Sequence, residues 1–257
     1  MPIKFTILGC GSSMGVPRAD GSFGSCNPSE KKNYRTRCSA IISSKYSNTL
    51  IDTSPDLRSQ LLQNNIKNID RVLYSHTHAD QTHGINDLRI FFIKNKKKIP
   101  VYCDIYTKNY LLKNFKYCFN NTFSYPAILK LNLIKKNNNF RDQNKNLNIK
   151  SIKVGHGKVE CNAFIINNIC AYLSDVNMIY EKDYKYFKNL KYFIVDCLRF
   201  KKHPSHFNLD EVLKLISILK PKKSILTNLH VDFDYNELKK ILPKNILPAY
   251  DGMNFDL

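Results

Sequence analysis

The sequence predicts an α/β fold, and two observations support this prediction. Short apolar segments typical of strands alternate with amphipathic segments typical of helices along the 257 residues. Several predicted strands also end at or just before a polar residue, namely Asp52, His76, His156, Asp175, Asp196 and His230. This recurrence is what a shared active site at one edge of stacked sheets requires. Since no internal repeat or linker is evident, we expect one domain over residues 1–257.

The predicted elements follow in chain order. The first part of the chain is predicted to contain strands at Phe5–Leu8, Ser39–Ser43, Thr49–Asp52, Arg71–Tyr74 and Pro100–Cys103. One helix is predicted to begin with Ser54 as its N-cap, and two more are predicted at Asp87–Ile93 and Thr107–Phe115. A strand at Leu129–Ile134 precedes a polar run, Lys135–Asn146, that is typical of a surface loop. The rest supplies strands at Leu147–Val154, Cys161–Ile166, Ala171–Leu173, Tyr192–Val195 and Ser224–Leu226, and helices at Asn208–Leu219 and Tyr235–Ile241.

Composition limits the class of protein. Hydrophobic residues make up 43% and charged residues 24%, which is typical of a globular protein. No apolar run approaches a membrane span, and the N-terminal run is too short for a secretory signal, so we expect a cytoplasmic protein. The eight cysteines show no C-x-x-C spacing, which predicts buried reduced thiols. The net charge of +19 reflects either a lysine-rich genomic composition or polyanion binding, and in both cases favours anionic substrates.

The segment from Ser75 to Gly84 reads SHTHADQTHG and contains three of the seven histidines. His76 and His78 follow a strand and are two residues apart, so on extended backbone both point to the same side and can hold one metal ion. With Asp80, they form a donor set suited to zinc or manganese. Gly84 is expected to permit a tight bend into the next helix.

These residues resemble the signature of the metallo-β-lactamase fold, and further motifs match it in order. Gly155-His156-Gly157, Ser174-Asp175 and His230-Val231-Asp232 resemble its later metal-binding motifs, and Asp52 resembles the aspartate that supports the metal loop. The resemblance implies an αββα sandwich: two mixed β-sheets flanked by helices, with a metal site at one edge.

Finer motifs resemble one branch of this superfamily. Gly9-x-Gly11-Ser12, Asn33-x-Arg35-x-Arg37 and His203-Pro-Ser-His206 are similar to the phosphodiesterases that include phosphoribosyl cyclic phosphate phosphodiesterase. The resemblance implies a metal-dependent hydrolase that cleaves a small or cyclic phosphodiester through a metal-bound hydroxide. Three alternatives stay open: a nuclease acting on RNA or DNA ends, an ester, thioester or lactone hydrolase, and a metal-poor binding protein.

The resemblance also implies a role for each matched residue. His76, His78 and His156 would hold a first ion, Asp80 and His230 a second, and Asp175 would bridge both. Asp80 and Asp175 would thereby take part in catalysis, with His206 as general acid on the leaving alkoxide. Arg35, Arg37 and Arg18 are candidate substrate anchors, because guanidinium groups anchor phosphate, and structural pairing with acidic residues is the alternative for each. His203 would contact the substrate or have a structural role.

Gln81 departs from the family pattern, which has a second-metal histidine at this position. A carboxamide oxygen is a poorer zinc ligand than imidazole. We therefore expect two divalent ions, zinc or manganese, with a weakened second site. In decreasing order of preference, that site survives through Asp80, Asp175 and His230, is empty, or takes His83 as a replacement. We expect a small anionic substrate, with nucleic acid as the alternative partner, no membrane association, and a homodimer as the candidate assembly.

Overall fold

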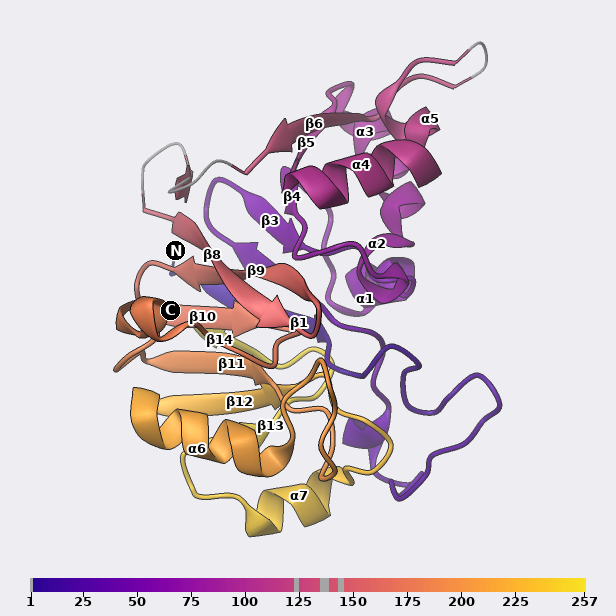
Figure 1. Cartoon of the computed structure of the whole chain (residues 1–257). Coiled ribbons are helices and arrows are strands. Elements are labelled where there is room, and N and C mark those ends of the chain that lie inside the picture. Colours follow the sequence, from indigo (N-terminus) through magenta and orange to yellow (C-terminus); the bar gives the residue numbers. More distant parts are fainter. Residues whose placement is uncertain (1, 123–124, 135–138, 143–145) are drawn as a thin grey trace.

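Two seven-stranded β-sheets lie face to face in the computed structural model, with helices on both outer sides (Figure 1). The structure describes residues 2–122, 125–134, 139–142 and 146–257. In the first sheet the strands are ordered β14 (Asn254–Asp256), β1 (Lys4–Gly9), β2 (Ser39–Ser43), β3 (Asn48–Ile51), β4 (Arg71–Leu73), β5 (Ile99–Cys103) and β6 (Leu129–Leu133). The second is ordered β13 (Ile246–Pro248), β12 (Lys223–Thr227), β11 (Tyr192–Asp196), β10 (Cys170–Leu173), β9 (Val159–Ile166), β8 (Asn148–His156) and β7 (Asn139–Arg141).

Both sheets are mixed. Strands β14, β1, β2 and β3 pair antiparallel, and β3 to β6 pair parallel. In the second sheet β7 to β10 are antiparallel and β10 to β13 parallel. The parallel arrangement gathers the carboxyl ends of β4, β10, β11 and β12 on one side, where the loops carrying polar residues begin.

Three apolar layers hold the sandwich together. Phe5, Ile42, Phe164 and Ile194 belong to the layer between the sheets. The outer face of the first sheet is covered by α1 (Leu57–Gln63), α3 (Arg89–Asn95), α4 (Ile105–Asn114) and α5 (Lys116–Phe119). The outer face of the second is covered by α6 (Leu209–Leu219), whose N-terminus is closed by an Asn208–Glu211 capping box, and by α7 (Tyr235–Ile241). The predicted αββα sandwich is therefore confirmed.

The differences from the sequence prediction are local. Strands β13 and β14 and the one-turn helices α2 (Ala79–Thr82) and α5 were not predicted, because segments of three or four residues carry too little periodicity. Ser54 is not the N-cap of α1: Asp56 takes that position, and Ser54 Oγ accepts a hydrogen bond from the Asp56 amide instead. Short 3-10 helices occupy Lys31–Asn33, Ile85–Leu88 and Glu181–Tyr186. The helix predicted over Asp87–Ile93 is therefore divided after Leu88, where a 3-10 helix ends and α3 begins.

The predicted loop over residues 135–146 is also wrong in part. Residues 139–141 form β7, which pairs antiparallel with β8. Residues 135–138 and 143–145 lie outside the described residues. All eight cysteines are buried and free, as predicted. Within the described chain, none of the helices has both the length and the apolar character needed to cross a lipid bilayer.

Candidate metal centre

Three imidazole rings meet at the edge of the sandwich. His76 and His78 follow β4, and His156 is the last residue of β8. The ring centroid of His76 lies 4.4 Å from that of His78 and 5.1 Å from that of His156, and the other two are 5.1 Å apart. The structure thus brings together the three histidines predicted to hold the first ion.

A hydrogen-bond relay orients the buried His76 ring. Asp52 accepts from the Ser75 amide and from Ser75 Oγ, both at 2.7 Å. Because Ser75 Oγ donates to Asp52, it accepts from His76 Nδ1 at 2.9 Å, which leaves the Nε2 lone pair directed into the cluster. Asp52 therefore lies where a residue supporting the metal loop must lie, and its backbone adopts a left-handed φ of 61° there.

The chemistry of this cluster fits a divalent ion. His76 Nε2 is buried without a hydrogen-bond partner in the part of the chain that the structure describes. Burial, reinforced by the neighbouring His78 and His156 rings, lowers the pKa of His76 to about 3, so the ring is neutral and available as a ligand. His156 donates from Nδ1 to the Ser205 carbonyl at 2.6 Å, which leaves its Nε2 lone pair facing His78 Nδ1, 3.4 Å away.

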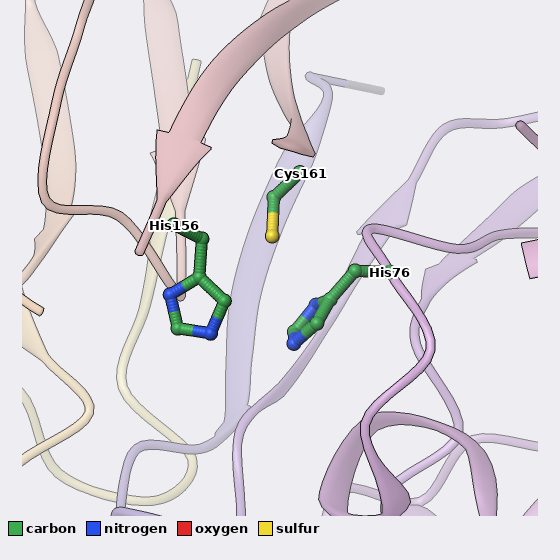
Figure 2. Close-up of side chains that lie close together, drawn as sticks. All are labelled: His76, His156 and Cys161. Atoms are coloured by element: carbon green, nitrogen blue, oxygen red, sulfur yellow. The ribbon is translucent and has the colours of Figure 1, made fainter. Parts of the chain in front are cut away.

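A thiol lies beside two of these rings. Figure 2 shows the Cys161 sulfur between His76 and His156, and one donor atom from each of the three residues lies within 4.8 Å of the others. Burial is the main cause that raises the pKa of Cys161 far above its usual range, and the charges of Asp175 and Asp52 add to it. Without an ion beside it, the thiol is therefore neutral, and it would have to lose its proton to act as a ligand.

Asp175 follows β10 and completes the donor set of the cluster. One donor atom each of Asp175, His156 and His206 lies within 4.8 Å of the others. Burial opposes ionisation of Asp175, but the His76, His206 and His156 rings outweigh it and hold its pKa below the ordinary value. A carboxylate beside three imidazoles is a ligand set that zinc accepts.

Gln81 connects the two acidic residues. Its side-chain Nε2 donates to Asp80 Oδ2 at 3.2 Å and to Asp175 Oδ2 at 3.1 Å. Its backbone carbonyl accepts from the Thr53 amide at 2.8 Å, which secures α2 against the strand that precedes α1. Gln81 is fully buried, so the carboxamide occupies the space beside both carboxylates.

His230 is engaged by a guanidinium. Arg18 Nη2 lies 2.7 Å from His230 Nε2, and His230 Nδ1 lies 3.2 Å from Asp232 Oδ1. A guanidinium can only donate, so the single lone pair of His230 accepts from Arg18. The side chains predicted to hold a second ion are therefore already engaged, and this donor set does not fit a second cation.

His206 lies beside the cluster and is hydrogen-bonded to a buried carboxylate. Its Nδ1 donates to Asp196 Oδ2 at 2.6 Å, and its ring lies 4.7 Å from that of His156. Asn228 Nδ2 donates to Asp196 Oδ1 at 3.2 Å. Burial alone would lower the pKa of His206, but the Asp196 charge and hydrogen bond outweigh it and raise the pKa to about 9. His206 is therefore protonated at neutral pH.

A cavity of about 280 Å³ lies beside these groups, and its wall includes His78, Asp80, Asp175, His206 and His230. His203, whose ring lies 5.0 Å from that of His206 between centroids, and Arg199 also line it. Several buried polar atoms at or beside the site have no hydrogen-bond partner among the described residues: Ser12 Oγ, Arg18 Nε, His76 Nε2, Gln81 Oε1, Ser174 Oγ and His230 Nδ1. A bound ligand can supply a partner to an unsatisfied polar atom at such a position.

The prediction that Arg35 binds substrate is wrong. Arg35 is 1% exposed, and its guanidinium donates to the Phe233 carbonyl at 2.6 Å, to Asn33 Oδ1 at 2.9 Å and to the His230 carbonyl at 3.4 Å. It stabilises the loop that carries His230.

Arg37 is also directed away from the cavity. Its Nε forms an ion pair with Asp56 Oδ2 at 2.9 Å, and it lines a separate pocket together with Lys31 and Tyr250. Of the predicted substrate-binding group, His203 lines the cavity, and Arg18 reaches it through its contact with His230.

The structure also bears on His83 and Gly84. His83 is exposed, packs on Phe115 and donates from Nδ1 to the Ala79 carbonyl at 2.9 Å, so it does not replace the missing ligand. Gly84 has an ordinary φ of −84°, and the need for glycine comes from close packing instead, because a Cβ there would lie 1.9 Å from the Ser54 carbonyl oxygen.

The sequence reasoning assigned no role to Asp196, Asn228 or Arg199. Asp196 ends β11 in the same way as the predicted ligands end or follow their strands, so its position was a usable signal. Asn228 and Arg199 follow β12 and β11 and have residue types common in loops, so nothing in the sequence distinguished them.

Comparison with known proteins agrees with this geometry. The family described as beta-lactamase superfamily domain matches residues 47–228. The structure is similar to a crystal structure of a diphosphatase from the PhnP family (29% identity, TM-score 0.91, 100% of this chain and 98% of that one). It also resembles zinc-bound PqqB from Methylobacterium extorquens in fold (15% identity, TM-score 0.80, covering 99% and 100%).

A curated protein with a different activity is also similar to this chain. The chain is 30% identical over 255 residues to an octanoyltransferase of Porphyromonas gingivalis, covering 98% of this chain. The chain spans about half of that protein, 51% of its length.

Proposed function

The chain belongs to the beta-lactamase superfamily domain family and is a hydrolase of the metallo-β-lactamase fold, and on this premise we propose that it hydrolyses a small phosphodiester, cyclic diesters included. The observation that carries the proposal is the Asp196–His206 pair, whose imidazole ring lies 4.7 Å from that of His156 between centroids and lines the cavity. An alkoxide is a poor leaving group unless it receives a proton, and a protonated imidazole held by a carboxylate can supply one.

His76, His78, His156 and Asp175 would hold the metal, for which we propose zinc because three imidazoles and a carboxylate suit it. A divalent ion bound there supplies Lewis acidity, which lowers the pKa of water and polarises phosphoryl oxygens. The protein's own groups do the rest. Asp52 and Ser75 orient His76, and Asp196 holds the His206 proton ready at Nε2 because Nδ1 is bonded to the carboxylate.

The cavity wall supports an anionic substrate of limited size. Arg199 and His203 line the same cavity as His206, and the net charge of +19 attracts anions to the molecule. A volume of about 280 Å³ accommodates a compact phosphate ester better than a long polymer segment. The similarity to a diphosphatase at 29% identity also supports chemistry at phosphorus.

Acyl ester or thioester hydrolysis is the second candidate, and the 30% identity to an octanoyltransferase favours it. An eight-carbon acyl chain needs an apolar channel. Of the residues that line the cavity, Met14 and Leu198 are the apolar side chains, and the others are polar or charged. We therefore rank this candidate below the phosphodiesterase.

Turnover with matched substrates tests the proposal. The zinc-loaded protein would be assayed with an aryl phosphodiester, a ribose cyclic phosphodiester, a diphosphate diester, a short RNA and 4-nitrophenyl octanoate. We expect turnover of the small diesters to exceed that of RNA and of the octanoate ester. Faster hydrolysis of the octanoate ester than of every diester would contradict the proposal and favour the second candidate.

A His206→Ala variant tests the proposed acid. We expect kcat for the ribose diester to fall by about 10²–10⁴-fold, whereas the loss for the aryl diester should be much smaller, because an aryl oxide leaves without protonation. His203→Ala is the matched control, since this neighbouring imidazole has no carboxylate partner among the hydrogen bonds of the described residues. Equal losses for both substrates would remove His206 from the role of acid.

A further inference from the structure

The residues that would surround a second ion are hydrogen-bonded in two groups. Arg18 and His230 lie 212 residues apart in the sequence and meet at 2.7 Å, and Gln81 contacts Asp80 and Asp175 within 3.2 Å. Asp80, Asp175 and His230 all line the 280 Å³ cavity. This set lies beside the position where substrate would bind.

Arg18 and a second ion would compete for the same lone pair on His230 Nε2. His230 Nε2 has one lone pair, and it accepts a hydrogen from the Arg18 guanidinium, a group that can only donate. A cation at His230 would have to break this bond and then lie beside the Arg18 positive charge. Both consequences disfavour metal binding at His230.

Gln81 acts on the carboxylates in a similar way. The amide Nε2 carries two hydrogens, and it has two acceptors, one oxygen each from Asp80 and Asp175. The amide therefore offers hydrogen-bond donors to the oxygens that would otherwise contact the ion. Its oxygen would be the group to bind a cation, yet that orientation would place oxygen against oxygen at both carboxylates and forfeit two hydrogen bonds.

We propose that this protein binds a single divalent ion at His76, His78, His156 and Asp175, and that Arg18 and Gln81 take the place of a second ion. Arg18 then supplies positive charge at His230, where the family pattern would place a cation. If the proposed function is correct, on which this last role rests, the Arg18 charge stabilises the phosphate oxygens of a bound diester.

Metal content tests the proposal without reference to activity. The wild-type protein would be saturated with zinc, dialysed, and analysed by plasma emission spectrometry together with an Arg18→Ala/Gln81→His double variant. We expect about one ion per wild-type chain and about two per double-variant chain, because the variant restores a free imidazole lone pair and removes the competing charge. Two tightly held ions in the wild type, or one in a folded double variant, would overturn the proposal.

A measurement on the wild type alone covers the case in which the double variant does not fold. Electron paramagnetic resonance of the manganese-loaded protein distinguishes isolated ions from pairs that are magnetically coupled at short distance. We expect the spectrum of an isolated ion even in excess manganese, and a coupled spectrum would overturn the proposal. An isolated ion without turnover of any diester would refute the proposed function while leaving this inference intact, and two coupled ions with turnover would do the reverse.

Discussion

Two groups of side chains near the cavity differ in which of their potential ligand atoms are free. Among His76, His78 and His156, lone pairs are directed at a common point, and His76 Nε2 is buried with no hydrogen-bond partner among the described residues. In the second group, Arg18 occupies the lone pair of His230 Nε2, and Gln81 Nε2 donates to Asp80 and Asp175. A buried polar atom without a partner is costly, so the free nitrogen of the first group favours binding of a ligand. In the second group, the imidazole nitrogen and the carboxylate oxygens that would contact an ion already accept hydrogen bonds. Metal binding is therefore expected at the first group only.

The largest effect should come from removing a member of the histidine cluster. We expect His76→Ala to abolish tight binding of the ion and to lower kcat/KM by roughly 10³-fold or more, because the metal chemistry is lost with it. Metal analysis and steady-state kinetics measure both quantities. Cys161→Ala is the matched control, since Cys161 lies beside His76 and His156 but outside the proposed ligand set. Loss of the ion in the control as well would assign the thiol a ligand role.

A smaller effect is expected from the relay that orients His76. Ser75→Ala removes the hydroxyl between Asp52 and His76 Nδ1, and it leaves Asp52 with one of its two bonds to residue 75. Loss of such a supporting contact commonly costs 10–100-fold in metal affinity, and we expect a change of about that size. Competition with a fluorescent zinc chelator would measure it. An affinity within about twofold of wild type would show that the relay does not control the ligand.

The Asp196–His206 pair predicts a shift in the pH profile. His206 is useful as an acid only when protonated, so activity should decline as pH rises through its pKa of about 9. Asp196→Asn removes the negative charge that raises the pKa of His206, whereas burial, which lowers this pKa, remains. The alkaline limb of log kcat should therefore move to lower pH, and kcat at neutral pH should fall by about tenfold or more. An unmoved limb would indicate that another group controls it.

The same pair affects stability with a defined sign. The folded-state pKa of His206 is raised above the unfolded value near 6.5, so its contribution to stability is complete below that value. The contribution is lost as pH rises from there through about 9.

The smallest effect on kinetics is expected from substitutions at two arginines. Arg199 lines the cavity, and Arg37 forms an ion pair with Asp56 outside it. We expect Arg199→Ala to raise KM for a diester by roughly fivefold to tenfold, in keeping with loss of one partly exposed charge contact. Arg37→Ala should leave KM unchanged and cost less than about 1 kcal/mol in stability, because the pair is partly solvated. The reverse ranking in KM would show that substrate reaches the Arg37 pocket.

Much of the fold and half of the site could be predicted because they depend on local signals. The strand before His76 ends in the metal loop, and the two-residue spacing to His78 places both rings on one side whatever the rest of the chain does. Arg35 shows where such reasoning fails. An arginine near phosphate-binding motifs has the residue type of an anchor, but its partners are backbone carbonyls of His230 and Phe233, almost 200 residues away.

The sequence by itself determined which metal-binding and hydrogen-bonding side chains the protein contains. It also determined the alternation of strands and helices that builds two sheets with polar residues at the strand ends of one edge. Only the tertiary structure decided which of those donors remain free. The pairing of Arg18 with His230, of Gln81 with Asp175 and of Asp196 with His206 joins segments far apart or across a turn. Periodicity reports whether a residue is buried, but it carries no information about which distant partner shares its hydrogen. A lone pair accepts one partner at a time, and folding chooses that partner.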